Sequence, residues 1–455
     1  MNNPALSDRM VNRESDIAYV MRCTEDAECC SVVGVSNIGK SMLLRALASD
    51  QVQERYLGKK RRDYLFVHVD LNLASQVTEQ GFYEVTLRNL LHALAMKEAD
   101  QELRETVQAA YRTIVGPGNS FVFPLAFEDC IQALCTGQSA VLVFLFDEFD
   151  EMFAEVDSRV FVRLRGLKDR LWGRLCYVIA TVHALNEQQR DRATGEFSEL
   201  FAAHIRHLHP LSESDSQLLV EEWAGRSQVG LTAGDVAFIV EVAGGHPALL
   251  QGAARVLAHA REEATCRPVS SGYEHVRELM DGDTSVRLEC AKLWNDLSVP
   301  EQETLIALLN GKETMTGADS LLEKGIVCLA PGGRVVFSQL LAGFARRQQL
   351  VRRRGPQGIR IDVEAGDVWV DGSLAPVLTD LEYKLLLLLY GNLDRICDKY
   401  KIVESVWGES YIDEVDDARI EKLVSRLREK LEPNPAKPRY LITIRGRGYK
   451  LVGPD

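Results

Sequence analysis

The 455-residue sequence has no apolar run near the roughly 20 residues that a helix needs to span a bilayer. Its polar N-terminus lacks the apolar segment of a signal peptide, so we expect a cytoplasmic protein with no membrane partner. The ten cysteines are scattered, and none forms a C-x-x-C pair. We therefore expect reduced thiols rather than a disulfide or metal framework.

The sequence also lacks an overall positive charge. Its net charge of −13 argues against nucleic-acid binding by the whole surface. The charge is uneven, however, because residues 358–418 carry 5 basic and 14 acidic side chains, whereas residues 419–450 carry 10 basic and 3 acidic ones. A local nucleic-acid-binding segment thus remains compatible with the composition, and the length predicts two to four domains.

A glycine-containing segment lies at residues 32–45, VVGVSNIGKSMLLR. The pattern G-x-x-x-x-G-K-[ST] occupies Gly34, Gly39, Lys40 and Ser41, between an apolar run and a helical pattern. Strand, loop and helix are the context that a phosphate-binding P-loop requires, so an ordinary surface turn is a poor explanation.

Each position of this loop suits ATP. Glycines let backbone N–H groups turn toward phosphate oxygens, and the N-terminus of the following helix adds partial positive charge. We expect Lys40 to bind the β- and γ-phosphates and Ser41 to ligate Mg²⁺, with Met42 completing the nucleotide site.

A second segment, AVLVFLFDEFD at residues 140–150, ends in carboxylates. Its unbroken apolar run predicts a strand buried on both faces of a parallel sheet, and Asp147 and Glu148 follow where such a strand opens onto a ligand crevice. We expect Asp147 to hold Mg²⁺ and Glu148 to orient or deprotonate the attacking water. Alone, the pair also fits a helix N-cap with an acid in the first turn.

Further buried strands are predicted at residues 64–73 and 175–182, with helical patterns between them. This alternation predicts an α/β fold with a doubly wound parallel sheet and the nucleotide at the strand ends.

In this order, the segments resemble the STAND and AAA-like P-loop ATPases over about residues 8–350. The resemblance implies that Arg13, of an Arg-Glu pair before the first strand, lies near the adenine, as does Pro247 of a helical lid. In that family an arginine at the end of the strand at 175–182 senses the γ-phosphate. Here His183 holds that position, which leaves Thr181, His183 or a nearby arginine as the sensor, and a surface or capping role fits His183 equally well.

The resemblance also implies an order of domains. We expect a P-loop NTPase core at 1–197, a helical lid at 198–285, and at 286–350 a winged-helix domain that packs on the ATPase. The last range carries helical patterns followed by two short β-runs. An Arg-rich linker at 351–357 ends in Gly-Pro.

Residues 358–455 closely resemble the OmpR/PhoB-type winged-helix DNA-binding domain. The motifs that carry the likeness are LTDLEYKLL at the first helix, VWGES after the second, RLREKL at the end of the recognition helix, and TIRGRGYKL in the wing. The fold class expected for the whole chain is therefore α/β, a P-loop NTPase with a parallel sheet, a helical lid and then two winged-helix domains.

Cations repeat along the predicted recognition helix at four-residue steps, as expected for a basic stripe that enters the major groove. Wing arginines suit the minor groove or phosphates. A solvated amphipathic helix is the plainer alternative. The candidate DNA-binding residues are Arg419, Lys422, Ser425, Arg426, Lys430, Arg445 and Arg447.

Two functions fit this composition. The first is a STAND-like switch that binds ATP and Mg²⁺, hydrolyses ATP slowly, self-associates, and binds double-stranded DNA as a transcription regulator. The absence of sensor repeats then implies a protein partner, or the DNA, as the source of the signal. The second is an ATP-dependent DNA-associated machine, or a phage-defence ATPase, that acts on DNA or on a partner protein.

Overall fold

The computed structural model describes residues 13–97, 100–117, 120–137, 141–266, 272–312, 317–331, 333–353, 358–361, 368–371, 373–376, 378–407 and 417–453. It divides into two compact units, Met1–Ala345 (unit 1) and Arg346–Asp455 (unit 2). Within the described ranges, no helix has both the length and the apolar composition needed to cross a membrane.

Unit 1 is built on a five-stranded parallel sheet with the strand order β2-β3-β4-β1-β5. The strands are β1 (Cys30–Val33), β2 (Tyr64–Asp70), β3 (Val141–Asp147), β4 (Leu175–Thr181) and β5 (Ile205–His207). Because β4 lies between β1 and β3, the carboxyl end of β4 lies between the glycine loop and the acidic pair. The sheet confirms the predicted α/β class and the first four strands.

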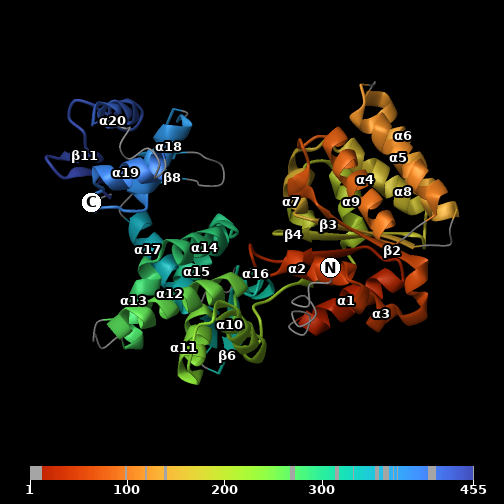
Figure 1. The fold of residues 1–455 in the computed structure, drawn as a ribbon, viewed down its shortest axis with the longest axis horizontal. Coiled ribbons are helices and arrows are strands. Elements are labelled where there is room, and N and C mark those ends of the chain that lie inside the picture. The colour runs from red at the N-terminus through yellow and green to blue at the C-terminus, as the bar shows by residue number, and fades with distance from the viewer. Residues whose placement is uncertain are drawn as a thin grey trace. The chain divides into compact units, whose positions relative to one another are not determined.

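Helices cover both faces of this sheet (Figure 1). Alternate residues of each central strand belong to different cores, so that Val143 and Leu145 pack on one side and Phe144 and Phe146 on the other. This two-sided burial explains the unbroken apolar runs of the strands. One face carries α1 (Glu14–Glu25), α2 (Lys40–Ala48) and α3 (Asp50–Leu57), and the other carries α4 (Glu79–Met96), α5 (Gln101–Val115), α6 (Phe123–Gly137), α7 (Phe149–Glu155), α8 (Arg159–Arg170) and α9 (Arg192–Ser198).

The edge strand β5 was not predicted. It lies beyond residue 197, where the sequence placed the end of the core, and it extends the sheet to His207. The strand has three half-buried residues, two of them polar, so it has neither an apolar run nor an alternating pattern.

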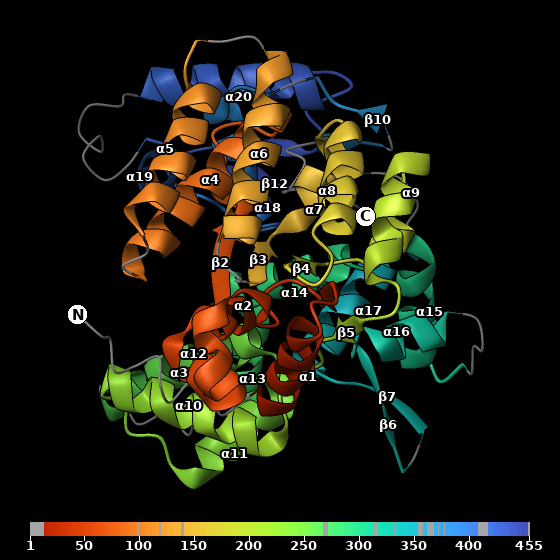
Figure 2. The ribbon, with the colours of Figure 1, turned by 90° about the vertical axis from the view of Figure 1, so that its right-hand side faces the viewer.

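A second group of helices follows the sheet (Figure 2). The lid comprises α10 (Glu213–Ser227), α11 (Ala233–Ala243), α12 (Pro247–Cys266) and α13 (Tyr273–Gly282). A serine caps its first helix, because the Ser212 hydroxyl oxygen accepts a hydrogen bond from the Asp215 N–H at 3.1 Å.

A small winged-helix unit completes unit 1. It contains α14 (Thr284–Asn295), α15 (Val299–Leu309), α16 (Ala318–Glu323) and the hairpin of β6 (Val327–Ala330) and β7 (Gly333–Val336). The following helix, α17 (Gln339–Arg353), includes the first three residues of the predicted linker, and residues 354–357 lie outside the described ranges.

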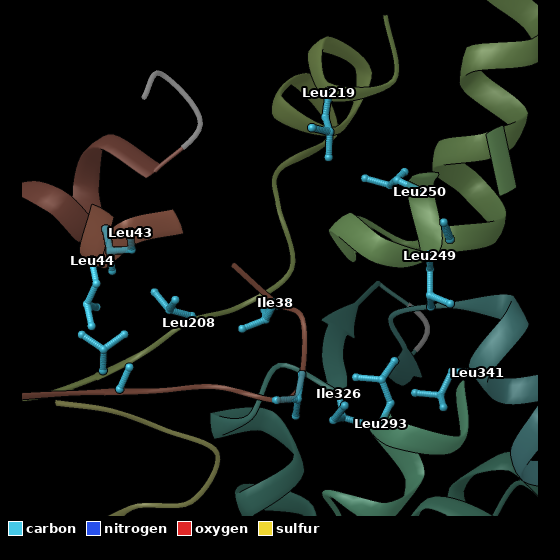
Figure 3. Close-up of a cluster of buried hydrophobic side chains, with 14 of the residues drawn as sticks. Ile38, Leu43, Leu44, Leu208, Leu219, Leu249, Leu250, Leu293, Ile326 and Leu341 are labelled. Atoms are coloured by element: carbon cyan, nitrogen blue, oxygen red, sulfur yellow. The ribbon is translucent and has the colours of Figure 1, made fainter. Parts of the chain in front are cut away.

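One apolar cluster joins the glycine loop to the lid and to this winged-helix unit (Figure 3). Ile38 of the loop, Leu249 and Leu250 of α12, Leu293 of α14 and Ile326 before β6 all belong to it. Buried contacts therefore hold three parts of unit 1 together around the loop.

Unit 2 has its own apolar core. Its elements are β8 (Ile359–Ile361), β9 (Val368–Val370), β10 (Ser373–Leu374), α18 (Asp380–Tyr390), α19 (Lys399–Val406), α20 (Asp417–Leu431), β11 (Leu441–Ile444) and β12 (Gly448–Leu451). A capping box begins α18, since Thr379 and Glu382 exchange side-chain and backbone hydrogen bonds there. The last three residues of the VWGES motif lie outside the described residues.

The buried carboxylate of Glu432 shapes the turn between α20 and β11. It accepts hydrogen bonds from the backbone N–H groups of Arg439, Tyr440 and Leu441 at 2.6, 2.9 and 2.7 Å. The turn would otherwise leave these donors without an acceptor next to the core, so this side chain fixes the wing relative to α20.

We therefore expect Glu432→Ala to lower the free energy of unfolding of residues 346–455 by about 2–4 kcal/mol, because the amides lose their charged acceptor. Urea denaturation of this unit measures the change. Glu429→Ala is the control, since Glu429 is exposed on the same helix, and it should change the stability by less than about 0.5 kcal/mol. Equal losses in both variants would contradict this role for Glu432.

Candidate functional site: a P-loop facing an acidic strand end

The glycine loop runs from the end of β1 to the first residue of α2. Gly39 has φ = 111°, and a Cβ on Gly34 would lie 2.8 Å from Ile38 Cγ2, so both glycines are needed for this tight path. Lys40 is 4% exposed, and its Nζ donates to the carbonyl oxygens of Gly34 at 2.7 Å and Val35 at 3.3 Å. The lysine thus points back over the loop, where a phosphate group would be held.

The next two residues of α2 lie in its first turn. Ser41 is half-buried, and the side chain of Met42 is 44% exposed. Residues in the first turn of a helix bind anions through their backbone amides, and Met42 has such a position.

The acidic pair lies at the end of β3. Asp147 is 1% exposed, and its Oδ2 lies 3.4 Å from His68 Nε2 of the neighbouring strand β2. Glu148 has φ = 54°, an unusual conformation for a residue with a side chain, and it begins α7. The pair therefore lies where the strand ends and a helix begins, and the parts expected of it in Mg²⁺ binding and catalysis stay predictions.

Electrostatics link Glu148 to the loop. Burial raises the pKa of the Glu148 carboxyl, and the charge of Lys40 opposes this shift, while Asp147, Asp150 and Asp70 add to it. Lys40 follows β1, Asp70 ends β2, and the other acids lie at or just after the end of β3, so the fold brings the loop lysine and the carboxylates together. A carboxyl with a raised pKa is suited to accept a proton.

The end of β4 lies between these two groups. Val33 pairs with Thr181, and Phe146 pairs with Ile179, two residues earlier on β4. The Thr181 hydroxyl oxygen is buried and, within the described part of the chain, has no hydrogen-bond partner. His183 Nδ1 lies 3.5 Å from Lys324 Nζ of the winged-helix unit. Both candidate sensors are therefore at this edge of the sheet.

The sequence reading missed Asp150, which holds the end of β4 in place. Its carboxylate accepts hydrogen bonds from the Val182 N–H at 2.9 and 3.1 Å and from Gln188 Nε2 at 2.9 Å. The signal in the sequence that could have identified Asp150 was an acid three residues after Asp147, at the start of a helical pattern.

Arg13 also contacts the loop. Its Nη2 donates to the Ile38 carbonyl oxygen at 2.6 Å, and its Nη1 donates to the His209 carbonyl oxygen at 2.8 Å. Burial lowers the pKa of this guanidinium, and the carboxylate of Asp16 opposes the shift. Arg13 thus connects the glycine loop to the segment after β5. Its position near the adenine stays a prediction.

Pro247 is the first residue of α12, and the sequence did not indicate a part for the preceding His246. His246 is fully buried, and burial lowers its pKa to about 4, so the ring is neutral near pH 7. Its Nε2 lies 2.9 Å from the Ser36 carbonyl oxygen in the loop. The lid therefore contacts the glycine loop through this histidine.

These residues fit a magnesium–nucleotide complex. The fit rests on the loop path that two glycines permit, the buried lysine above it and the unpartnered Thr181 hydroxyl beside it. Among the described residues there is no cluster of three or more His, Cys, Asp or Glu side chains that could hold a metal. Mg²⁺ in nucleotide sites usually keeps several waters and takes further oxygen ligands from the phosphates.

Helix α20 of unit 2 presents an exposed polar face. Arg419, Lys422, Ser425 and Arg426 are exposed on it, and Arg445 and Arg447 are exposed in the turn between β11 and β12. Six of the seven predicted DNA-binding residues therefore lie at the surface.

The seventh residue, Lys430, is half-buried. Its Nζ lies 2.6 Å from Glu382 Oε2, and Glu382 is almost fully buried. This ion pair joins the end of α20 to the first turn of α18. Neighbouring Arg428 is likewise structural, and it donates to the Leu441 carbonyl oxygen at 2.7 and 2.9 Å.

The fold and these two sites define a class of protein, a P-loop NTPase that also carries a C-terminal winged-helix DNA-binding domain. Residues 28–227 match the model of the NACHT domain, and residues 375–451 match the model described as transcriptional regulatory protein, C terminal. The chain therefore contains a NACHT-type P-loop NTPase domain and an OmpR/PhoB-type domain, which confirms both parts of the predicted resemblance.

Curated relatives match about a quarter of this chain. Sensory transduction protein RegX3 of Mycolicibacterium smegmatis is 39% identical over 104 residues, which cover 23% of this chain and 43% of the relative. Response regulator ArlR of Staphylococcus haemolyticus is 37% identical over 113 residues, covering 23% of this chain and 49% of the relative. The chain thus spans less than half the length of these relatives.

Solved structures with detectable likeness include the ORC2 protein of Aeropyrum pernix in ADPNP and ADP complexes, at 15% identity and a TM-score of 0.43, covering 75% of this chain and 95% of that one. The DNA-binding domain of Klebsiella pneumoniae RstA in complex with the RstA box is 26% identical with a TM-score of 0.19, covering 21% of this chain and 92% of that one.

We expect Lys40→Ala to abolish ATP binding, because it removes the cation that lies over the loop. Isothermal titration of the full chain with Mg-ATP measures this. Arg45→Ala, which removes an exposed cation from the same helix, should bind like the wild type. Unaltered affinity in Lys40→Ala would contradict the assignment of the loop.

We expect Glu148→Gln to bind ATP but to hydrolyse it roughly 10²–10⁴-fold more slowly, the usual contribution of a general base. Phosphate release under single-turnover conditions measures the rate. Glu151→Gln removes an exposed acid from the same helix and should retain the wild-type rate. A wild-type rate in Glu148→Gln would assign the base elsewhere.

Proposed function

We propose that this protein is an ATP-dependent DNA-binding regulator, in which the nucleotide state of unit 1 controls DNA binding by unit 2. The observation that carries the proposal is the presence, in one chain, of a P-loop opposite an acidic strand end and a winged helix with an exposed basic face. The role that fits such a pair best is a switch in transcription regulation in the cytoplasm.

The residues of unit 1 have distinct parts in this proposal. When ATP binds, Lys40 leaves the two loop carbonyl oxygens and binds the β- and γ-phosphates. Ser41 and Asp147 hold Mg²⁺, which neutralises phosphate charge when bound. Glu148 accepts the proton of the attacking water, and its raised pKa supports this part. Asp150 positions the end of β4, where Thr181 and His183 lie beside the γ-phosphate.

Hydrolysis in this proposal is slow and resets the switch. A regulator needs two states with different affinities for its target, and it does not need fast turnover. ATP-bound chains self-associate, so that a second DNA-binding unit acts at high local concentration on a neighbouring half-site. A partner protein, or the DNA itself, supplies the signal.

The exposed residues of unit 2 form two groups, one that contacts bases and one that contacts phosphates. Lys422, Ser425 and Arg426 face outward from α20 and are the candidates for base edges, whereas Arg445 and Arg447 of the wing are the candidates for phosphates. Residues 358–455 carry 15 basic and 18 acidic side chains, but the acids concentrate before residue 418, so the basic face can still approach DNA.

The first test uses residues 346–455 and a duplex site selected from random sequences. Arg426→Ala or Lys422→Ala should weaken that site by about 1–3 kcal/mol relative to unrelated duplexes, because a base contact is lost. Arg445→Ala should weaken all duplexes alike and lower the salt slope by roughly one. Lys430→Ala is the contrasting variant, which should reduce stability rather than selectivity. No binding to any duplex at low salt would refute DNA binding by this unit.

The second test compares the full chain with and without Mg-ATP on the selected duplex, across salt concentrations. Tighter binding with ATP, lost in Lys40→Ala, supports the switch. An unchanged affinity would mean that the NTPase serves another purpose, such as a DNA-associated machine.

A further inference from the structure

Strand β2 places a histidine beside the acid that ends β3. His68 is half-buried, and its Nε2 lies 3.4 Å from Oδ2 of Asp147, which is 1% exposed. In the pairing of the two strands, His68 is opposite Leu145, and Asp70 is opposite Asp147. The contact therefore runs diagonally across the strand pair, toward the carboxyl ends where the nucleotide site is proposed.

Both side chains lie on the face of the sheet that carries α2. Phe66 of β2, Leu145 of β3 and Leu44 of α2 belong to one buried cluster. Because side chains alternate between the two faces of a strand, His68 and Asp147 lie on the same face as these residues. The same helix also begins with the lysine and serine of the P-loop, so the histidine lies on the side of the sheet where phosphate and Mg²⁺ are expected.

The Asp147 carboxylate is contacted at both oxygens. Its Oδ1 accepts a hydrogen bond from the backbone N–H of Glu148 at 3.2 Å, and its Oδ2 faces the His68 ring. An ionised carboxylate only accepts hydrogen bonds, so the ring donates through its Nε2–H. A carboxylate has about four acceptor positions, and these two contacts leave others for a cation or its water. Together the two donors fix the plane of the carboxylate.

The charges nearby explain why a donor from β2 is needed. Asp70, opposite Asp147 in the strand pair, carries a like charge, and its Oδ1 accepts the Asn72 N–H at 3.2 Å. Repulsion between the two carboxylates favours rotation of Asp147 away from β2, and the His68 N–H opposes this rotation. A lysine or arginine at this position would compete with Mg²⁺ for the same oxygens, whereas an imidazole N–H donates without needing a charge.

We propose that His68 is a positioning residue for Mg²⁺, because it orients the Asp147 carboxylate without touching the ion or the nucleotide. Loss of such an outer partner usually lowers metal affinity by about 10- to 100-fold. His68 therefore determines how much affinity Mg²⁺ adds to nucleotide binding, and it does not determine the affinity for the nucleotide alone. This inference rests on the proposed nucleotide site, and it adds a residue of β2 to the metal end of that site.

The test titrates the full chain with a non-hydrolysable ATP analogue, once with Mg²⁺ and once with EDTA. The ratio of the two affinities measures what Mg²⁺ contributes. His68→Phe keeps a planar ring on the strand and removes its nitrogens. It should lower the ratio by roughly 10- to 100-fold and leave the affinity in EDTA nearly unchanged. A purely structural role of His68 would instead weaken binding in both conditions by a similar factor.

Three further variants make the test specific. His68→Gln retains an N–H donor and should keep most of the ratio. His92→Phe removes an exposed histidine from α4 and should leave both affinities unchanged. In an Asp147→Asn background, His68→Phe should change the ratio by less than about twofold, because the partner that it orients is already altered. If His68→Phe fails to fold, His68→Leu replaces it.

An unchanged ratio in the folded His68 variant, or an equal loss of affinity in EDTA, would overturn the inference. A full further loss in the Asp147→Asn background would overturn it as well, and so would a wild type whose affinity does not depend on Mg²⁺. If the wild type binds the analogue in neither condition, the proposed nucleotide site itself fails. The two failures are therefore distinguishable in one set of titrations.

Discussion

The pairing of three parallel strands determines where the polar groups of the nucleotide site lie. Because β4 pairs with both β1 and β3, the glycine loop, Thr181 and Asp147 meet at one edge of the sheet. The strands are buried on both faces, so core packing holds this edge and the loops add only the final contacts. The lid and the small winged helix contact the same edge through His246 and Asp296, which both hydrogen-bond to Ser36 of the glycine loop.

Local patterns were enough to predict much of this architecture. The P-loop and the acidic strand depend on residues that are close in sequence, and their chemistry requires particular residue types at fixed spacing. The C-terminal domain could be predicted from the sequence equally well, because several motifs occur in order and the apolar face of α20 is regular. The exposed cations of that helix follow from the same periodicity, with Arg426 as a clear case.

The contacts that were missed depend on residues far apart in the chain. Ser36 and Asp296 are 260 positions apart, and no local pattern marks either of them. Strand β5 forms because it pairs with β1, and its own composition does not predict a strand. Lys430 fits the four-residue spacing of the basic stripe, but a buried partner on α18 determines where its side chain goes, and only the packed structure reveals that partner.

The ion pair between Lys430 and Glu382 affects how this protein responds to ionic strength. Glu382 also accepts the Thr379 N–H at 2.8 Å, so one carboxylate joins the start of α18 to the end of α20. Dissolved ions screen such a sheltered pair weakly, whereas they weaken phosphate contacts made by exposed arginines strongly. Salt concentrations that elute the protein from a polyanionic column should thus leave the helix pair intact, so that repeated cycles of binding and release need no refolding.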